Sequence, residues 1–483
     1  GVQDITLTAE KLKALNIATG TNSKIVTDRN VNLTSTTDKG GATVAYGQIG
    51  DSATAKANDV SINATGQKTL TAGNIYANGD VNLTTHFTQE GSSAIYGLAT
   101  TTGIPGAVYA KNLTINHSAN SDITDGIIKT NGHLYLSGDL TVNASGFKEL
   151  NLNNAASSIP PLSYEVMNVG GNATFNTTAT VAGSVVNAGF IETTSDHVSA
   201  IRAKSLTINA NAAAGITDAT VKYGNFESQG GNVNITANNQ KSVDIGYLRG
   251  FNTTDDSKKT DVNINLNTTV ANASVKIGAY NNFFNGIGDR DTNPNQKAKD
   301  VNITANGQKE FFVKNIWAVG DINLNIKGSG MAATAKLMQS ETTAHATNYT
   351  IKGKNVTLNF ENLSEIKTGR VVAEEKVTIK TGSNNFLQYA EFKSGGYGVA
   401  AIEGKVVDID ISNVTQRPNH RVDYASNPGD PINTAIGIGV SQELTVKGYA
   451  SNTVTWINAG LYMSDPAVDF KANLTNVMGG IQA

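Results

Sequence analysis

Cysteine is absent from the 483 residues, and only 8 residues are proline and 2 are tryptophan. The missing thiols exclude disulfide scaffolds, thiolate metal sites and cysteine nucleophiles. Charged residues make up 16% of the chain and the formal net charge is -3, so the composition indicates no nucleic-acid partner. The chain has no run of about 18 apolar residues, so we expect no transmembrane segment.

A short unit of two apolar residues around one polar residue, flanked by Asn, Asp or Thr, recurs sixteen times. Successive units start 21 to 39 residues apart, and their alternation has the period of two that is typical of β-strands. The first apolar residues of the units are Val31, Val60, Val81, Leu113, Leu140, Ala173, Leu206, Val233, Val262, Val301, Ile322, Val356, Val377, Val407, Leu444 and Val468.

Two longer segments show what one repeat contains. Residues 59–84 and 300–325 share one pattern at equal length: a strand, an Asn-Gly or Thr-Gly turn, Gln-Lys, a second alternating strand, and Gly-Asp before the next unit. Two or three strands of about five residues cannot bury their apolar face alone, so each repeat must stack on the next.

The sequence therefore predicts an all-β protein, a right-handed parallel β-helix (solenoid) of about sixteen coils with variable loops. A sandwich would favour two-residue hairpins and longer repeats, and a propeller would favour about 40 residues per blade. Asn and Gly suit the coil corners, and stacked Asn side chains could form amide ladders, although solvation alone would explain the same composition.

The N-terminal segment is the one stretch with a helical pattern. Residues 8–20 have Thr8 as a candidate N-cap and Gly20 as a stop signal, so we expect residues 1–27 to cap a β-helix domain at 28–483. The alternative is one further strand, because the Leu-Asn-Ile sequence alternates.

Function is expected in the longest loops, because the strands are committed to pairing. Other stretches expected to protrude are 86–110, which contains Tyr96 and Tyr109, and 157–166. The aromatic and charged residues of the two longest loops are the predicted binding residues: Tyr280, Phe283, Phe284, Arg417, His420, Arg421 and Tyr424.

Asp289, Asp291 and Asn293 have the first three ligand positions of a calcium loop. The loop lacks glycine at position 6 and a carboxylate at position 12, so an ordinary solvated turn is the favoured interpretation and no other cofactor is expected.

Catalytic patterns are poorly represented, and we expect no enzyme. Asp408 and Asp410 share one side of a strand, which is more typical of an outward polar face than of paired catalytic carboxylates. The two tryptophans, Trp317 and Trp456, occupy strand-like positions that favour a core or capping role over a sugar platform.

Strings such as GGNVNITANNQK (230–241) and RAKSLTINANAAAG (202–215) resemble the repeats of large bacterial surface proteins. These include filamentous-haemagglutinin-like and high-molecular-weight adhesins, autotransporter passengers and Gram-negative surface-layer proteins. The resemblance implies a right-handed β-helix, an extracellular location at the bacterial surface or outer membrane, and a role in virulence-related attachment or surface coating. The chain begins without Met, so we expect a processed product or a piece of a larger protein.

We therefore expect a non-enzymatic surface stalk whose loops adhere to a glycan or protein on a host or neighbouring cell. The first alternative is a self-assembling surface-layer or filament subunit. The second is a polysaccharide-binding or polysaccharide-degrading β-helix that resembles a phage tailspike or a lyase.

Overall fold

A computed structural model describes residues 3–20, 23–51, 55–98, 107–152, 165–189, 200–250, 254–278, 286–288, 297–330, 332–337, 351–382, 389–392, 400–412, 421–423, 438–448, 455–461 and 469–482. The chain forms two compact units, residues 1–246 and 247–483. Within these described segments no α-helix occurs, and a three-residue 3₁₀ helix spans Asp256–Lys258. The remaining regular structure consists of strands.

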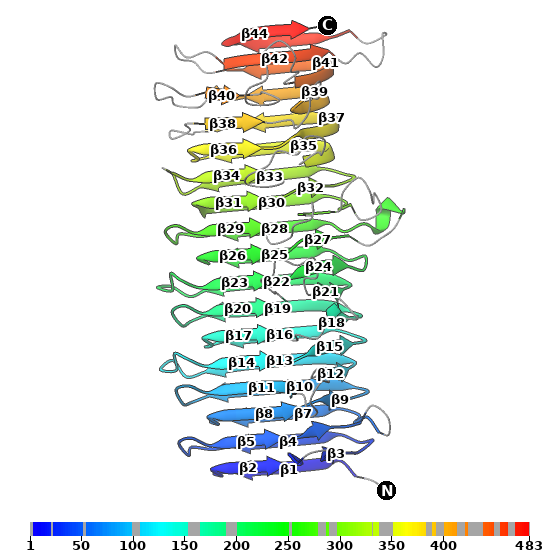
Figure 1. Cartoon of the computed structure of the whole chain (residues 1–483), viewed down its shortest axis with the longest axis vertical. Coiled ribbons are helices and arrows are strands. Elements are labelled where there is room, and N and C mark those ends of the chain that lie inside the picture. Colours follow the sequence, from blue (N-terminus) through cyan, green and yellow to red (C-terminus); the bar gives the residue numbers. More distant parts are fainter. Residues whose placement is uncertain are drawn as a thin grey trace. The chain divides into compact units, whose positions relative to one another are not determined.

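In the unit of residues 1–246, each winding of the chain adds strands to three parallel sheets, and Figure 1 shows the successive windings as stacked layers. The first sheet contains β1 Ile5–Glu10, β4 Val31–Thr36, β7 Val60–Thr65, β10 Asp80–Phe87, β13 Asn112–Ala119, β16 Leu140–Ser145, β19 Asn172–Ala179, β22 Ser205–Ala212 and β25 Val233–Asn238. The second contains β2 Ala14–Ile17, β5 Thr43–Tyr46, β8 Thr69–Gly73, β11 Ser93–Leu98, β14 Ile127–Thr130, β17 Glu149–Leu152, β20 Val185–Ala188, β23 Thr220–Tyr223 and β26 Ser242–Ile245. The third contains β3 Lys24–Ile25, β6 Gln48–Ile49, β9 Ile75–Tyr76, β12 Ala107–Ala110, β15 His133–Leu136, β18 Glu165–Val169, β21 Ala200–Ala203 and β24 Asn225–Ser228.

In the unit of residues 247–483, the same three-sided arrangement is present. The first sheet contains β28 Val262–Asn267, β30 Val301–Gln308, β33 Ile322–Gly328, β35 Ile351–Glu361, β37 Val371–Lys380, β39 Ile402–Asp410, β41 Ile438–Lys447 and β43 Lys471–Thr475. The second contains β29 Ser274–Ile277, β31 Glu310–Val313, β34 Thr334–Leu337, β36 Glu365–Thr368, β38 Tyr389–Phe392 and β40 Arg421–Asp423. On the third side lie β27 Leu248–Arg249, β32 Ile316–Trp317, β42 Thr455–Leu461 and β44 Val477–Gln482.

The long strands of the second unit serve two sides of the winding. The first residues of β35 pair with β32 in one neighbouring winding and with the first residues of β37 in the other. The later residues of β35 pair with β33 and with the last residues of β37. The register shifts between Gly353 and Asn355, so a bulge replaces the turn that separates the two sides elsewhere. All these pairings are parallel, and each unit is therefore a parallel β-helix, as the repeats predicted.

The pairing register follows the sequence repeat. Val31 pairs with Val60, and Val60 pairs with Val81. Because a shift of one residue would turn the apolar set outward, burial of one face fixes this register. The inward residues Val31, Val60 and Val81 are fully buried, and burying an aliphatic side chain stabilises the fold by about 1.5 to 3 kcal/mol.

Both ends of the repeat series differ from the sequence prediction. The helix expected at residues 8–20 is wrong: β1 and β2 occupy this segment and pair with β4 and β5, so the alternative of a further strand is confirmed. Of the last unit, expected at Val468 and Phe470, Val468 lies outside the described residues, and the strand position expected for Phe470 is wrong. In the structure Leu444 pairs with Ala472 in β43, which leaves Phe470 before the strand.

The corners and ladders account for the Asn and Gly content. Gly66 and Asn239 directly follow β7 and β25, and Gly307 is the next-to-last residue of β30. Their φ angles are 84°, 55° and 86°, a left-handed conformation that Gly and Asn tolerate best. Outward Asn side chains of the first sheet also bond across windings. The Nδ2 of Asn143 donates to Asn116 at 2.9 Å, and the Nδ2 of Asn176 donates to Asn143 at 2.9 Å. Amide ladders are therefore confirmed.

Candidate functional site

Three tyrosines stack on the outer face of the third sheet in the first unit. Tyr76, Tyr109 and Tyr135 occupy equivalent register positions on β9, β12 and β15. Their ring centroids lie 5.0 and 4.7 Å apart, and both pairs of planes are inclined by 11°. These separations match the spacing of adjacent strands, so the β-helix itself sets the stack. We call these three residues the tyrosine stack.

Strand alternation turns the tyrosine stack outward. The neighbours Ile75, Val108 and Leu134 point into the core and are buried, whereas the tyrosines are half-buried. Since successive side chains of a strand alternate between its faces, each apolar neighbour fixes the direction of its tyrosine. The tyrosine stack therefore lies at the surface, and the buried neighbours hold its backbone in place.

The residues that continue this register position are smaller or charged. Tyr135 pairs with Asn168 on β18, and Asn168 pairs with Arg202 on β21. Arg202 in turn forms an ion pair with Glu227 of β24, with Nη2 and Oε2 3.2 Å apart. Because asparagine follows Tyr135 in the register, no described tyrosine of the next winding stacks on that face of the Tyr135 ring.

A groove runs beside the end of the stack. It has a volume of about 360 Å³ and spans the corners of five successive windings. At a strand spacing of about 4.8 Å, its length is roughly 20 Å. The groove is lined by Lys56, Ala77, Asn78, Tyr109, Ala110, Lys111, Tyr135, Leu136, Ser137 and Asn168.

Hydrogen-bonding groups in the groove are available to a ligand. In the part of the chain that the structure describes, the side chains of Lys56, Lys111, Asn78, Ser137 and Asn168 have no hydrogen-bond or ion-pair partner. Burial raises the pKa of Tyr109, and the neighbouring phenols of Tyr135 and Tyr76 raise it further. The Tyr109 hydroxyl therefore remains a protonated donor at neutral pH.

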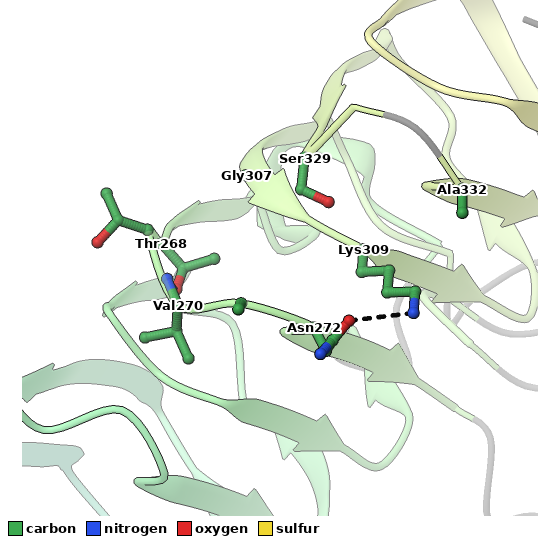
Figure 2. Close-up of a pocket in the computed structure, with 9 residues that line it drawn as sticks. Thr268, Val270, Asn272, Gly307, Lys309, Ser329 and Ala332 are labelled. Carbon is green, nitrogen blue, oxygen red and sulfur yellow. Dashed lines mark hydrogen bonds between the residues drawn. The ribbon is translucent and has the colours of Figure 1, made fainter. Parts of the chain in front are cut away.

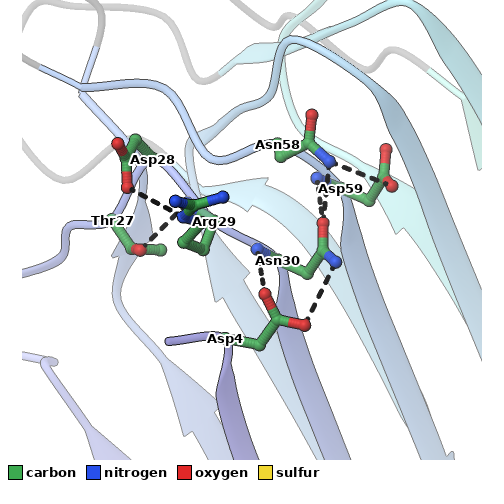
Figure 3. A network of polar contacts seen from close by, with 7 residues as sticks. All are labelled: Asp4, Thr27, Asp28, Arg29, Asn30, Asn58 and Asp59. Atoms are coloured by element: carbon green, nitrogen blue, oxygen red, sulfur yellow. Dashed lines mark hydrogen bonds and ion pairs between the residues drawn. The ribbon is translucent and has the colours of Figure 1, made fainter. Parts of the chain in front are cut away.

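A ladder of Asx side chains holds the corner beside the groove. Figure 3 shows its start: Asp4 accepts from the backbone and side-chain amides of Asn30, whose Oδ1 accepts from the backbone N–H of Asp59. The ladder continues as Asp59 accepts from the N–H of Asp80 at 2.8 Å, and Asp80 accepts from Nδ2 of Asn112 at 2.8 Å. These bonds fix the backbone that carries Asn78 and Lys111.

The same ladder passes the far end of the groove. Asn112 accepts from the N–H of Asp139 at 2.7 Å, and Asp139 accepts from the N–H of Asn172 at 2.7 Å. Ser137 and Asn168 therefore flank a corner that is also held by side-chain bonds. Carboxylates that accept backbone N–H groups are already engaged within the corner.

A second hollow lies in the unit of residues 247–483, at the corner between the first and second sheets. Its volume is about 510 Å³, and Figure 2 shows Thr268, Gly307 and Ser329 around it. The Nζ of Lys309 donates to Oδ1 of Asn272 at 3.0 Å, so this cation already has a partner. No aromatic side chain lines the hollow. The groove in the first unit is therefore the better candidate site.

The structure does not describe the side chains of the binding and calcium residues predicted from the long loops. Arg421 starts β40, but its side chain lies outside the described residues. Also outside the described residues are Tyr280, Phe283, Phe284, Asp289, Asp291, Asn293, Arg417, His420 and Tyr424.

Other sequence predictions are tested by the structure. The stretch 86–110 was expected to protrude. In its described parts this is wrong, because Tyr96 is fully buried in β11 and Tyr109 belongs to β12, while residues 99–106 lie outside the described residues. Trp317 is 2% exposed, which confirms its core role, whereas the side chain of Trp456 is not described. Asp408 and Asp410 do face outward, and the nearest Lys Nζ to the carboxylate of Asp410 is 3.3 Å away, from Lys447.

Sequence reasoning missed the tyrosine stack. Each of the three tyrosines precedes the first apolar residue of the next repeat unit by four or five residues. This shared offset is the signal that could have placed them on one face, since equivalent repeat positions stack. The shared offset is hard to recognise in the sequence because the loops that precede the three tyrosines differ in length.

Comparisons with known proteins give no further guide. No family model matches the chain, and neither a curated protein nor a solved structure matches it. Across the described segments, no helix is both long and apolar enough to cross a membrane. Likewise, the part of the chain that the structure describes contains no group of three or more His, Asp or Glu residues suited to a metal ion.

Proposed function

We propose that this chain is a non-enzymatic, extracellular bacterial surface protein, a β-helical scaffold that attaches the cell to a glycan-bearing surface. The observation that carries the proposal is the groove beside the tyrosine stack, which crosses five windings and presents polar side chains without partners. The repeats, which resemble those of bacterial adhesins, support the surface location.

The architecture supports attachment because the strands use their backbone hydrogen bonds in pairing between successive windings. Each winding hydrogen-bonds to its neighbours and faces outward with alternating side chains. Outward residues can then vary without loss of the core. A fixed backbone with variable outer side chains is well suited to recognition, since the binding groups are preorganised.

Adhesion of coated beads tests this proposal. Beads that carry the purified chain should adhere to glycan-coated surfaces more than beads coated with an unrelated β-helical protein. Enzymatic removal of the surface glycans should abolish the difference. Equal adhesion of the two kinds of bead would contradict the proposal.

Two further measurements separate the alternatives. Concentration-dependent sheets or filaments in sedimentation and electron microscopy would favour a surface-layer or filament subunit. Release of reducing ends from a polysaccharide would favour a degradative enzyme. We expect neither from the chain on its own.

A further inference from the structure

The groove is shaped for a polymer. Its lining residues come from five successive windings, from Lys56 to Asn168, over roughly 20 Å. Its two tyrosines, Tyr109 and Tyr135, have ring centroids 4.7 Å apart, which is close to the advance of one sugar unit in an extended polysaccharide. A chain of several sugar units would therefore meet equivalent corners in turn, whereas a single monosaccharide would fill a small part of the groove.

Tyr135 supplies the aromatic surface. One face of its ring packs on Tyr109, and the opposite face is followed in the register by Asn168. His133, two residues earlier on the same strand, flanks the ring with a centroid separation of 5.7 Å. The ring face toward Asn168 can contact the C–H face of a sugar, and Asn168 and Ser137 can exchange hydrogen bonds with sugar hydroxyls.

The charged side chains that line the groove are both cationic. Lys56 and Lys111 both line it, and neither ammonium group has an ion-pair partner among the described residues. The nearby corner carboxylates Asp59, Asp80 and Asp139 instead accept hydrogen bonds within the Asx ladder. Two unpartnered cations along one groove favour an anionic ligand.

These three observations agree on one ligand class. We propose that the groove binds a linear acidic polysaccharide, with a sugar unit on the open face of Tyr135 and its carboxylate or sulfate groups at Lys111 and Lys56. This inference rests on the proposed role in glycan attachment and adds the chemical class and the residues. The two lysines are separated along the groove, so they would contact acidic groups on different sugar units.

A binding titration of the full chain tests this inference. The probes are a fluorescent oligogalacturonate, its carboxyl-reduced neutral form, an oligosaccharide of dextran sulfate, and poly-glutamate. We expect the oligogalacturonate or the sulfated probe to bind at least about ten-fold more tightly than the neutral form, with affinity that falls as salt rises. The better of the two distinguishes a carboxylate from a sulfate ligand.

The chain offers a matched control for the lysines. Lys204 occupies the same corner in the sequence AKSLTIN (203–209) that Lys111 occupies in AKNLTIN (110–116), and it does not line the groove. The backbone N–H and C=O of both lysines make equivalent bonds to neighbouring windings. Lys56→Gln combined with Lys111→Gln should weaken acidic-probe binding by about ten-fold or more, and Lys204→Gln should leave it unchanged.

The aromatic contact has its own conservative variant. Tyr135→Leu should weaken binding by about ten-fold, whereas Tyr135→Phe retains the ring and should stay within about three-fold of the parent chain. An unchanged circular dichroism spectrum shows that each variant is folded. Equal losses in the Phe and Leu variants would contradict the role of the ring face.

The remaining outcomes are equally decisive. Equal binding of the neutral and acidic probes would overturn the inference. An effect of Lys204→Gln equal to that of the double Lys56→Gln, Lys111→Gln variant would also overturn it. Tighter binding of poly-glutamate than of either acidic glycan would overturn it in favour of an acidic protein partner. If beads adhere to glycans but the groove variants adhere equally well, this inference fails while the proposed function stands.

Discussion

Tyr109 and Tyr135 stack face to face across two windings, with ring centroids 4.7 Å apart and planes inclined by 11°. Tyr76 stacks on the other face of Tyr109 at 5.0 Å. Tyr109 is therefore the central ring and the only one of the three in contact with both others. The stack joins three windings through side chains as well as through backbone hydrogen bonds.

Substitution of the central ring should cost more stability than substitution of an end ring. An aromatic pair contributes about 0.5 to 1.5 kcal/mol beyond its buried area, so Tyr109→Ala should destabilise the chain by about 2 kcal/mol. Tyr76→Ala removes one ring contact and should cost about half as much. Urea denaturation followed by circular dichroism provides the comparison.

Tyr109→Phe is the control for this prediction, because it keeps both ring contacts and removes only the hydroxyl. It should remain close to the parent chain in stability. A loss for Tyr76→Ala equal to that for Tyr109→Ala would show that the stack does not stabilise the windings pairwise.

His117 should make the chain sensitive to acid. Its Nδ1 lies 2.7 Å from Oγ1 of Thr85, its ring packs against Phe87, and its side chain is buried. Burial lowers the pKa of His117 to about 3, with a further contribution from the nearby His86, while a backbone contact at Gly146 opposes the shift.

The direction in which stability changes with pH follows from the protonation of the unfolded chain. Unfolded His117 binds a proton below about pH 6.5, but the folded chain does not until about pH 3, so its contribution is fully present above pH 6.5 and is lost as the pH falls. The loss should reach about 3 kcal/mol at pH 4.5. Urea titrations at pH 7.5 and 4.5 should show a much smaller loss in His117→Asn, whereas His86→Asn should retain most of the loss, because burial is the larger cause of the pKa shift.

The fold was predictable because its signal repeats. Val31, Val60 and Val81 each begin a unit with the same alternation, and consistent local patterns at many positions specify one register. The segment 8–20 was misassigned since its apolar residues fit a helix as well as a strand. Parallel pairing of β1 and β2 with β4 and β5 decides between them, and this pairing is remote in sequence.

The candidate site was less predictable because it arises from pairing between windings. Tyr76, Tyr109 and Tyr135 are separated by loops of different length, so no local motif connects them. Trp317 illustrates the same difficulty. It matches Tyr76 in the aligned repeats, yet Trp317 is buried and Tyr76 is half-buried. Equivalent repeat positions predict a shared face, but not how much of that face is covered.

The asparagines of the amide ladder in the first unit differ in how many ladder hydrogen bonds they make, and their contributions to stability should differ accordingly. Asn143 bonds to both Asn116 and Asn176, while Asn209 bonds to Asn176 at 2.8 Å and ends the series. A hydrogen bond contributes about 1 kcal/mol net, so Asn143→Ala should cost about 2 kcal/mol and Asn209→Ala about 1 kcal/mol. Urea denaturation of the two variants measures the difference, and equal losses would argue against an energetic role for the ladder.

Gly66 tests whether the corners require glycine for backbone conformation or for space. Its φ is 84°, and a Cβ at this position would lie 2.0 Å from the carbonyl oxygen of Thr37 in the preceding winding. Gly215 has nearly the same φ, 87°, but a Cβ there would meet nothing within 4 Å. Gly215→Ala should therefore cost only the conformational strain, about 1 kcal/mol. Gly66→Ala should cost at least about 3 kcal/mol, because the backbone of two windings must also separate. Thermal unfolding of both variants decides the point: a similar loss of stability would mean that the left-handed conformation alone, and not the close approach of successive windings, selects glycine at this corner.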